Sequence, residues 1–160
     1  MFVPFDTLPD ESKIWIYQCN RKFSDEEVNQ IENDLMTFVE DWSAHGTGLE
    51  ASFVVKYNRF IILAVNQEVQ MATGCSIDKS VEFIQSLEKK YMVDLLDKMN
   101  VTYKQGEHIT HKTLTDFKRM AKEKAVSENT IVFNNLVNTV GEWHEYWEVP
   151  AIESWHSRFF

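Results

Sequence analysis

Hydrophobic and polar positions change their spacing along the chain, which predicts a mixture of strands and helices. Ile14 and Ile16 alternate with two aromatic residues within residues 13–19, so this stretch is apolar on both faces. Residues 60–65 are also apolar on both faces, whereas residues 51–57 carry their larger apolar side chains on one face. These patterns are typical of two buried strands and one half-buried strand.

A complete start signal predicts the first helix. Ser24 is the expected N-cap, Glu27 closes a capping box, and Phe23 with Val28 forms a hydrophobic staple. Apolar residues then recur at helical spacing on one face: Val28, Ile31, Leu35, Phe38, Val39 and Trp42. Gly46 provides a natural C-terminal stop.

A hairpin and a second helix follow. Asn58 and Arg59 separate the two strand patterns between residues 51 and 65, so they are expected to form the turn. The second helix is predicted from about Ile77, with these residues on its buried side: Val81, Ile84, Leu87 and Tyr91. Residues 93–99 are expected to continue as a short helical turn.

Two further strands are predicted at residues 101–104 and 108–111, joined around Gly106. The order strand, helix, strand, strand, helix, strand is the split βαβ arrangement of ferredoxin-like folds. We therefore predict an α+β protein with a ferredoxin-like domain over residues 1–105, in which both helices cover one face of an antiparallel sheet. The other face must meet solvent, a partner or another part of the chain.

Residues 106–160 are predicted to form a small C-terminal α/β subdomain packed on that domain. Thr113 caps a third helix with Asp116 in its first turn, and strands are expected at residues 130–133 and 140–149. The chain ends in aromatic residues with more apolar surface than a frayed terminus normally carries. We expect this tail to be docked.

Composition narrows the classes of function. The chain has 160 residues and a net charge of -9, which disfavours binding to nucleic acid or to an anionic membrane. No apolar run is long enough to span a bilayer, and the expected location is cytoplasmic. The two cysteines, Cys19 and Cys75, are expected to be free thiols. No close Cys or His spacing predicts a metal site, and no cofactor is expected.

A glycine-led polar cluster precedes the predicted second helix. The candidate binding residues in it are Gly74, Ser76, Lys79 and Ser80. The cluster superficially resembles a phosphate-binding P-loop, but a P-loop needs a second glycine directly before its lysine, and this chain has Asp78 there. A carboxylate at that point would repel a phosphate, so a P-loop ATPase is not expected.

The same cluster admits two other interpretations. Cys75 near a helix N-terminus could be a nucleophile, with His45 as base and Asp78 or Asp41 as orienting carboxylate. The alternative is structural: Cys75 is a small buried hydrophobe, and Ser76 or Asp78 is the N-cap. Because caps and buried thiols are far commoner than catalytic ones, the structural interpretation is favoured.

The C-terminal part of the chain is rich in aromatic residues, and Trp143 and Trp155 are its candidate binding residues. Aromatic residues are enriched at interface hot spots, so these two could bind a protein or peptide partner. The favoured alternative is that a small subdomain needs large side chains to build its core.

Several runs resemble a small uncharacterised bacterial family, and the resemblance covers nearly the whole chain. They are residues 15–21, 56–65, 74–80, 132–137 and 154–160. Members of that family often carry the name "ABC transporter ATPase". This chain has no Walker A, Walker B or LSGGQ-type signature, so its residues do not support that name.

Residues 114–133 are weakly similar to bacterial GYF-like modules. The similarity rests on Leu114 and Phe117, the stretch 125–130, a strand ending at Phe133, and Trp143 beyond it. It implies recognition of proline-rich peptides, although the Gly-Tyr-Phe signature itself is absent from this chain.

The sequence as a whole favours a non-catalytic binding or adaptor module, which could also act as a homodimer. The alternative is a small enzyme with its site around Cys75. The two differ in what a substitution at Cys75 or Asp78 should cost: stability for a structural role, activity for a catalytic one.

Overall fold

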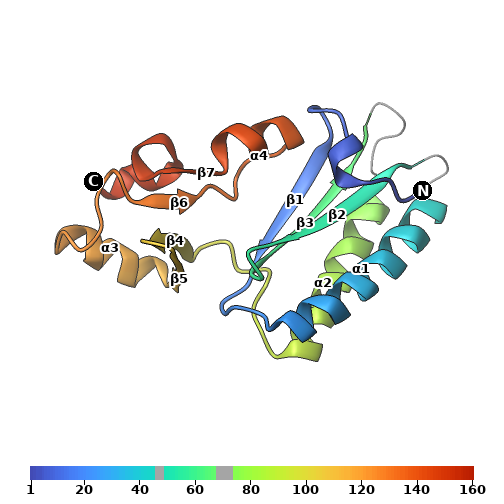
Figure 1. The fold of residues 1–160 in the computed structure, drawn as a ribbon, viewed down its shortest axis with the longest axis horizontal. Helices are drawn as coiled ribbons and strands as arrows, with labels where there is room; N and C mark the ends of the chain where they lie inside the picture. Colours follow the sequence, from blue (N-terminus) through green and yellow to red (C-terminus); the bar gives the residue numbers. More distant parts are fainter. Residues whose placement is uncertain (46–48, 68–73) are drawn as a thin grey trace.

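In the computed structural model, which describes residues 1–45, 49–67 and 74–160, two antiparallel sheets pack with four α-helices (Figure 1). The first sheet has the order β1-β3-β2, with β1 at Lys13–Gln18, β3 at Phe60–Val65 and β2 at Ala51–Lys56. The predicted α+β class is confirmed. Side chains are described from the same ranges except residues 43–45.

The second sheet has the order β5-β4-β6-β7. Its strands are β4 (Val101–Gln105), β5 (His108–Lys112), β6 (Ile131–Phe133) and β7 (Glu148–Pro150). The helices are α1 (Asp25–His45), α2 (Gly74–Tyr91), α3 (Leu114–Lys122) and α4 (Val140–Tyr146). Three short 3-10 helices are η1 (Phe5–Thr7), η2 (Ala151–Glu153) and η3 (Trp155–Phe159).

The ferredoxin-like detail is not confirmed. The first three strands and both long helices follow the split βαβ order, with β3 antiparallel to β1 and β2. The expected fourth strand, Val101–Gln105, does not join this sheet but pairs with β5 and β6. The second sheet therefore begins before residue 106, where we had drawn the boundary of the subdomain.

The start of α1 matches its sequence signal. The Ser24 Oγ accepts a hydrogen bond from the Glu27 N–H at 3.1 Å, and the Glu27 Oε1 accepts from the Ser24 N–H at 2.9 Å. Arg21 donates to both carboxylate oxygens of Glu27, at 2.9 and 2.8 Å. These bonds, the Arg21 pair first, lower the pKa of Glu27 to about 2. The predicted stop at Gly46 lies outside the described residues.

The β2–β3 hairpin is confirmed, but its turn is placed one residue earlier than expected. Tyr57 and Asn58 take the two left-handed positions, with φ of 55° and 54°. The Arg59 N–H then donates to the Lys56 carbonyl at 3.0 Å. Asn58 tolerates this conformation well, whereas Tyr57 is held in it by its neighbours.

Two element predictions were wrong. Residues 140–149 form α4 followed by β7 rather than one strand. The Thr139 side chain accepts from the Glu142 N–H at 3.2 Å, and this capping bond starts a helix where the aromatic content predicts a strand. A Cβ at Gly141 would lie 3.1 Å from the Asp10 Cβ, and glycine lets the start of α4 approach that loop. Residues 93–99 form no helical turn.

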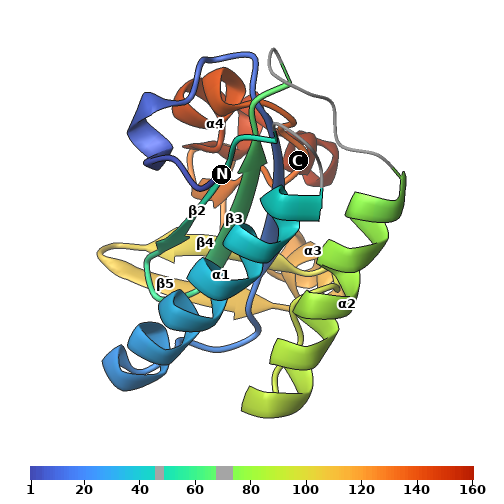
Figure 2. The same ribbon diagram turned by 90° about the vertical axis from the view of Figure 1, so that its right-hand side faces the viewer.

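Apolar layers on both faces of the first sheet hold the molecule together. One layer lies between this sheet and the pair α1 and α2, which run side by side over one face (Figure 2). The opposite face is covered by the C-terminal part of the chain, through these residues: Phe133, Val137, Val140 and Trp147. A third cluster lies between the second sheet, α3 and η3. Of the three possibilities that the sequence left for this face, the structure shows another part of the chain.

A buried amide joins the two sheets at the end of β1. The Gln18 Oε1 accepts hydrogen bonds from the Thr102 Oγ1 at 2.8 Å and the Asn135 Nδ2 at 2.9 Å, while its Nε2 donates to the Asn100 carbonyl at 2.7 Å. The Asn135 Oδ1 in turn accepts from the Trp147 Nε1 at 2.9 Å. Side chains from both sheets and from the segments around β6 and β7 therefore share one hydrogen-bonded network.

The aromatic tail is docked. Phe117 of α3 is fully buried, and its ring contacts the rings of Phe159 and Phe160 with centroids 5.9 and 6.4 Å apart. His156 is 1% exposed, and its Nδ1 lies 2.7 Å from the Ser154 Oγ. Burial, assisted by the charge of Arg158, lowers the pKa of His156 to about 4.

Deleting residues 155–160 should lower the melting temperature strongly. The deletion uncovers Phe117, and losses of this size in a core cost on the order of 3–5 kcal/mol. Thermal unfolding followed by circular dichroism measures the change. Removing Phe160 alone, which is 38% exposed, should cost much less, and an unchanged melting temperature after the full deletion would contradict the docked tail.

Acid should weaken the fold through His156. Its folded pKa of about 4 lies below the ordinary 6.5, so between these values the unfolded chain takes up a proton that the folded protein does not. The free energy of unfolding should fall by about 3 kcal/mol as the pH drops through this window. Urea unfolding of His156→Gln should lack this contribution to the pH dependence, and His108→Gln, an exposed control, should retain it.

Candidate functional site

The start of α2 does not form the site that the glycine-led cluster suggested. Cys75 is exposed rather than buried, and Asp78 and Lys79 are exposed as well. Gly74 is already helical, so Ser76 and Asp78 lie inside α2 and neither is its N-cap. The structural interpretation of Cys75 as a small buried hydrophobe is therefore wrong.

Ser76 and Ser80 of the cluster make hydrogen bonds within the fold. The carbonyl of Ser76 accepts a hydrogen bond from the Trp42 Nε1 at 3.0 Å, which ties α2 to α1. Ser80 is buried, and its Oγ donates to the Ile77 carbonyl at 2.6 Å. The side chain of His45, the proposed base, lies outside the described residues. Nothing in the described structure brings a base to Cys75.

Trp155 belongs to the core of the tail. Its ring stacks on His156 with centroids 3.9 Å apart, and it packs against the cluster below α3. The Arg158 guanidinium lies over the same ring at 5.4 Å. The structural alternative therefore accounts for the contacts of Trp155.

Trp143 lies in a different setting, on the wall of an open cleft. The cleft has a volume of about 450 Å³. Its lining comes from η1, β2, α4 and the start of β7: Phe5, Asp6, Val54, Lys56, Tyr57, Trp143, His144, Trp147 and Glu148. We call it the Trp143 cleft. Of the residues that the sequence offered as partner-binding candidates, only Trp143 lines it.

Aromatic contacts hold the inner wall of the Trp143 cleft. The rings of Trp143 and Trp147 lie 5.2 Å apart, and Tyr57 stacks on Trp147 at 6.0 Å. Phe5 meets Trp143 edge-on at 5.5 Å. Trp147 also donates a hydrogen bond from its Nε1 to the Asn135 Oδ1, which fixes the orientation of its ring.

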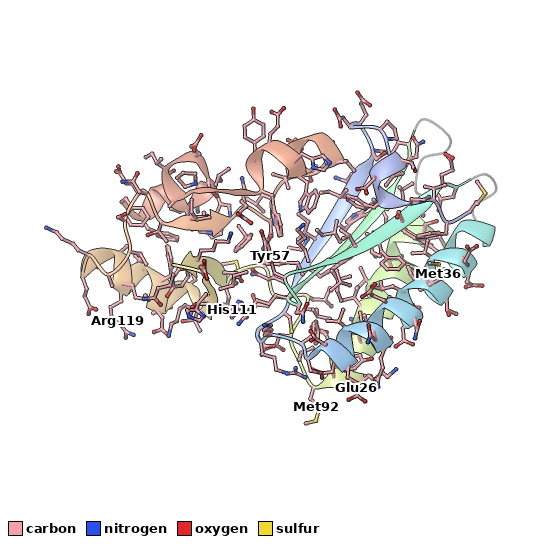
Figure 3. All side chains as sticks on the ribbon, viewed as in Figure 1. Glu26, Met36, Tyr57, Met92, His111 and Arg119 are labelled. Carbon is pink, nitrogen blue, oxygen red and sulfur yellow. The ribbon has the colours of Figure 1, made fainter. Side chains whose placement is uncertain are left out.

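Glu148 and Lys104 form a charged group next to Tyr57, which lies near the middle of the molecule (Figure 3). The Tyr57 hydroxyl donates to the Glu148 Oε1, and Lys104 contacts the Oε2 at 2.8 Å. Burial first, and then Glu148, raises the pKa of Tyr57. Burial acts to raise the pKa of Glu148, but the bonds from Lys104 and Tyr57 outweigh it and lower that pKa. The Tyr57 phenol therefore stays protonated and the Glu148 carboxylate stays ionised near neutral pH.

Two polar groups at the cleft have no ion-pair or hydrogen-bond partner among the described residues. The Trp143 Nε1 is buried and unpaired, a state that costs about 1–3 kcal/mol. The Lys56 ammonium forms no ion pair there and lies 5.7 Å from the centre of the Tyr57 ring and 5.9 Å from that of Trp143. The carboxylates of Asp6 and Glu148 also line the cleft, and the charge of Lys56 acts on Glu148, so the aromatic wall carries charges of both signs at its edge.

The outer edge of β2 runs along the cleft. The Ala51 N–H donates to the Met1 carbonyl at 3.1 Å, and the Ala51 carbonyl accepts from the Val3 N–H at 3.0 Å. Backbone groups of an antiparallel edge strand face outward at every second residue, so those of Phe53 and Val55 face outward too. No described residue pairs with them.

Sequence reasoning missed most of the cleft. The sequence places Lys56, Tyr57 and Glu148 only in predicted strands, and Phe5 in no predicted element. The contacts of Glu148 could not be predicted, because Lys104 and Tyr57 are remote from it in sequence. The one available signal was the aromatic residue at the β2–β3 turn, where a polar residue is commoner.

Comparison with family models, curated proteins and solved structures finds no match to this chain. The resemblances to the small bacterial family and to GYF-like modules therefore stay predictions. Among the described side chains, no group of three or more His, Cys, Asp or Glu residues could hold a metal ion. Within the same part of the chain, no helix is both long and apolar enough to cross a membrane.

The exposure of Cys75 gives a direct test of its role. In the native protein a thiol reagent should modify Cys75 rapidly and Cys19, which is fully buried, only after unfolding. Cys75→Ala and Asp78→Ala should each change the free energy of unfolding by less than about 0.5 kcal/mol, because both side chains are exposed. Mass spectrometry of the labelled protein and urea unfolding measure these outcomes. Equal labelling of both cysteines would contradict the assigned burial.

Proposed function

We propose that this protein is a non-catalytic binding module that takes up an extended peptide segment of a partner protein. The peptide would add to the outer edge of β2 as a further strand and place side chains in the Trp143 cleft. The observation that carries this proposal is the juxtaposition of two features: a strand edge at Phe53 and Val55 with which no described residue pairs, and an aromatic cleft to which the same strand contributes Val54 and Lys56. Strand addition is a common mode of peptide recognition.

The chain already uses this edge once. Residues 1–3 pair with Ala51 in parallel, and the chain then leaves the edge at Pro4 to form η1. The free backbone groups begin directly beyond that point. An added strand would extend the same ladder, and its backbone bonds would supply affinity with little dependence on sequence.

Specificity would come from the cleft. Side chains of a strand alternate between faces, so every second residue of the peptide would point toward Trp143 and Tyr57. Burial of apolar side chains against these rings favours a peptide with alternating apolar positions. Lys56 stands where β2 enters its turn, and it would pair with an acidic residue at that end of the peptide.

This mode makes a different demand on the ligand from the one that the GYF-like resemblance implies. A proline-rich peptide stacks on aromatic side chains in the polyproline conformation and lacks the N–H groups that an edge strand requires. The two ligand classes can therefore be separated with the same protein.

Selection from a random-peptide display library should yield sequences with alternating apolar residues and few prolines. Trp143→Ala should weaken binding of a selected peptide by at least about thirtyfold, as expected for a tryptophan hot spot. Tyr146→Ala is the matched control, because Tyr146 lies on the same helix, is 51% exposed and does not line the cleft, so it should leave affinity unchanged. Isothermal titration calorimetry measures each dissociation constant.

The strand edge is tested separately. Val55→Pro removes an outward N–H, a change that edge strands tolerate, and it should abolish binding while the protein stays folded by circular dichroism. In the unaltered protein, the amides of Phe53 and Val55 should exchange with solvent faster than that of Val54 and become protected when peptide binds. Selection of proline-rich sequences, or binding without protection of these amides, would overturn strand addition.

A further inference from the structure

Arg59 is a half-buried cation without a counter-ion. It follows the two left-handed residues of the β2–β3 turn, and its carbonyl accepts from the Cys19 N–H at 2.7 Å, which fixes its backbone against the end of β1. Its Nη1 is buried and has no hydrogen-bond partner among the described residues. No described carboxylate lies within ion-pair distance of its guanidinium, in contrast to Arg21 and Arg119.

The side chain of Arg59 lines a cavity that is distinct from the Trp143 cleft. This cavity has a volume of about 580 Å³ and lies between the β2–β3 turn, the β4–β5 turn and the residues before α1. Its other lining residues are Lys22, Asp25, Tyr57, Asn58, Glu107, His108 and Ile109. We call it the Arg59 cavity. Tyr57 is the one lining residue that it shares with the cleft.

The charges around the Arg59 cavity differ in how strongly water screens them. Lys22, Asp25, Glu107 and His108 are exposed, and the Asp25 carboxylate already accepts from the Asn58 Nδ2 at 2.8 Å. Arg59 is the most enclosed of the charged lining residues, and burial lowers its pKa, so its charge lacks the solvation that stabilises it in water. Arg59 is therefore the charged lining residue that water screens least, whereas the exposed cations and carboxylates of the lining are screened more strongly.

His111 lies close enough to Arg59 for the charge of Arg59 to act on it. His111, on β5, is half-buried, and its pKa is lowered by burial first and then by the charge of Arg59. Asp94 and Asp97 act on His111 in the opposite direction and do not outweigh these effects. The electrostatic effect of Arg59 thus reaches a residue of the second sheet.

We propose that the Arg59 cavity binds an oxyanion, a phosphate or carboxylate group of a small ligand, through the Arg59 guanidinium. The planar guanidinium presents its donors as a fork that matches the paired oxygens of either group. A bound oxyanion restores the interactions that the half-buried cation lacks. Lys22 and His108 stand at the exposed rim of the cavity, where they would add attraction that salt weakens.

Titration with inorganic phosphate and with succinate tests the proposal and separates the two oxyanion classes. Two-dimensional NMR of the peptide-free protein should show saturable shifts of the Arg59 side-chain Nε–H and of the Asn58 and His108 amides. Potassium chloride at matched ionic strength should not produce them. Because no peptide is present, this outcome is independent of peptide binding to β2.

Variants establish that the guanidinium is responsible. Arg59→Gln should raise the dissociation constant of the preferred anion by at least about tenfold, and Arg59→Lys should give an intermediate value because it keeps the charge and loses the fork. Lys79→Gln removes an exposed cation from α2, which contributes no lining residue to the cavity, and it should behave as the unaltered protein. Linear shifts with both anions, or equal responses of Arg59→Gln and the unaltered protein, would overturn the site.

Discussion

The side-chain amide of Gln18 is the point at which the two sheets become one structure. It emerges from the end of β1 into a buried region, where its oxygen and nitrogen must both find partners, because an unpaired buried polar group costs about 1–3 kcal/mol. The partners come from the start of β4 and from the segment after β6. Asn135 also accepts a hydrogen bond from Trp147, and the Trp147 ring packs against Trp143 in the inner wall of the Trp143 cleft. Both sheets are thereby held in one relative position.

Local signals predicted the elements well, and long-range pairing could not be predicted. The capping box of Ser24 and Glu27 and the cap of Thr113 each involve residues three apart, so the sequence reveals them directly. The strand at Val101 fits either sheet by its apolar pattern. In the second sheet this strand pairs with Val132, which lies far along the chain. Its link to β1 is the hydrogen bond from Thr102 to the Gln18 amide.

The candidate site shows the same division. Trp143 could be proposed from aromatic content alone, but its cleft also needs Phe5, Lys56 and Glu148 from remote segments. The glycine-led cluster looked the richest in chemistry because its residues adjoin in sequence. In the structure the β2–β3 turn, which contains Arg59, lies at the opposite end of the first sheet from the start of α2 (Figure 1), so proximity along the chain was a poor guide. Arg59 carried no signal beyond its place in a turn.

One face of the first sheet is covered by C-terminal residues, and this has a consequence for folding during synthesis on the ribosome. Ile14, Ile16, Phe60 and Ile62 belong to an apolar cluster that is complete only when residues 133–147 have been made. During synthesis of the intervening segment, the nascent chain displays a hydrophobic sheet face with an open edge beside it, a combination prone to aggregation. Shielding of such surfaces by chaperones would therefore matter most during a defined interval of translation, which ends when Trp147 leaves the ribosome.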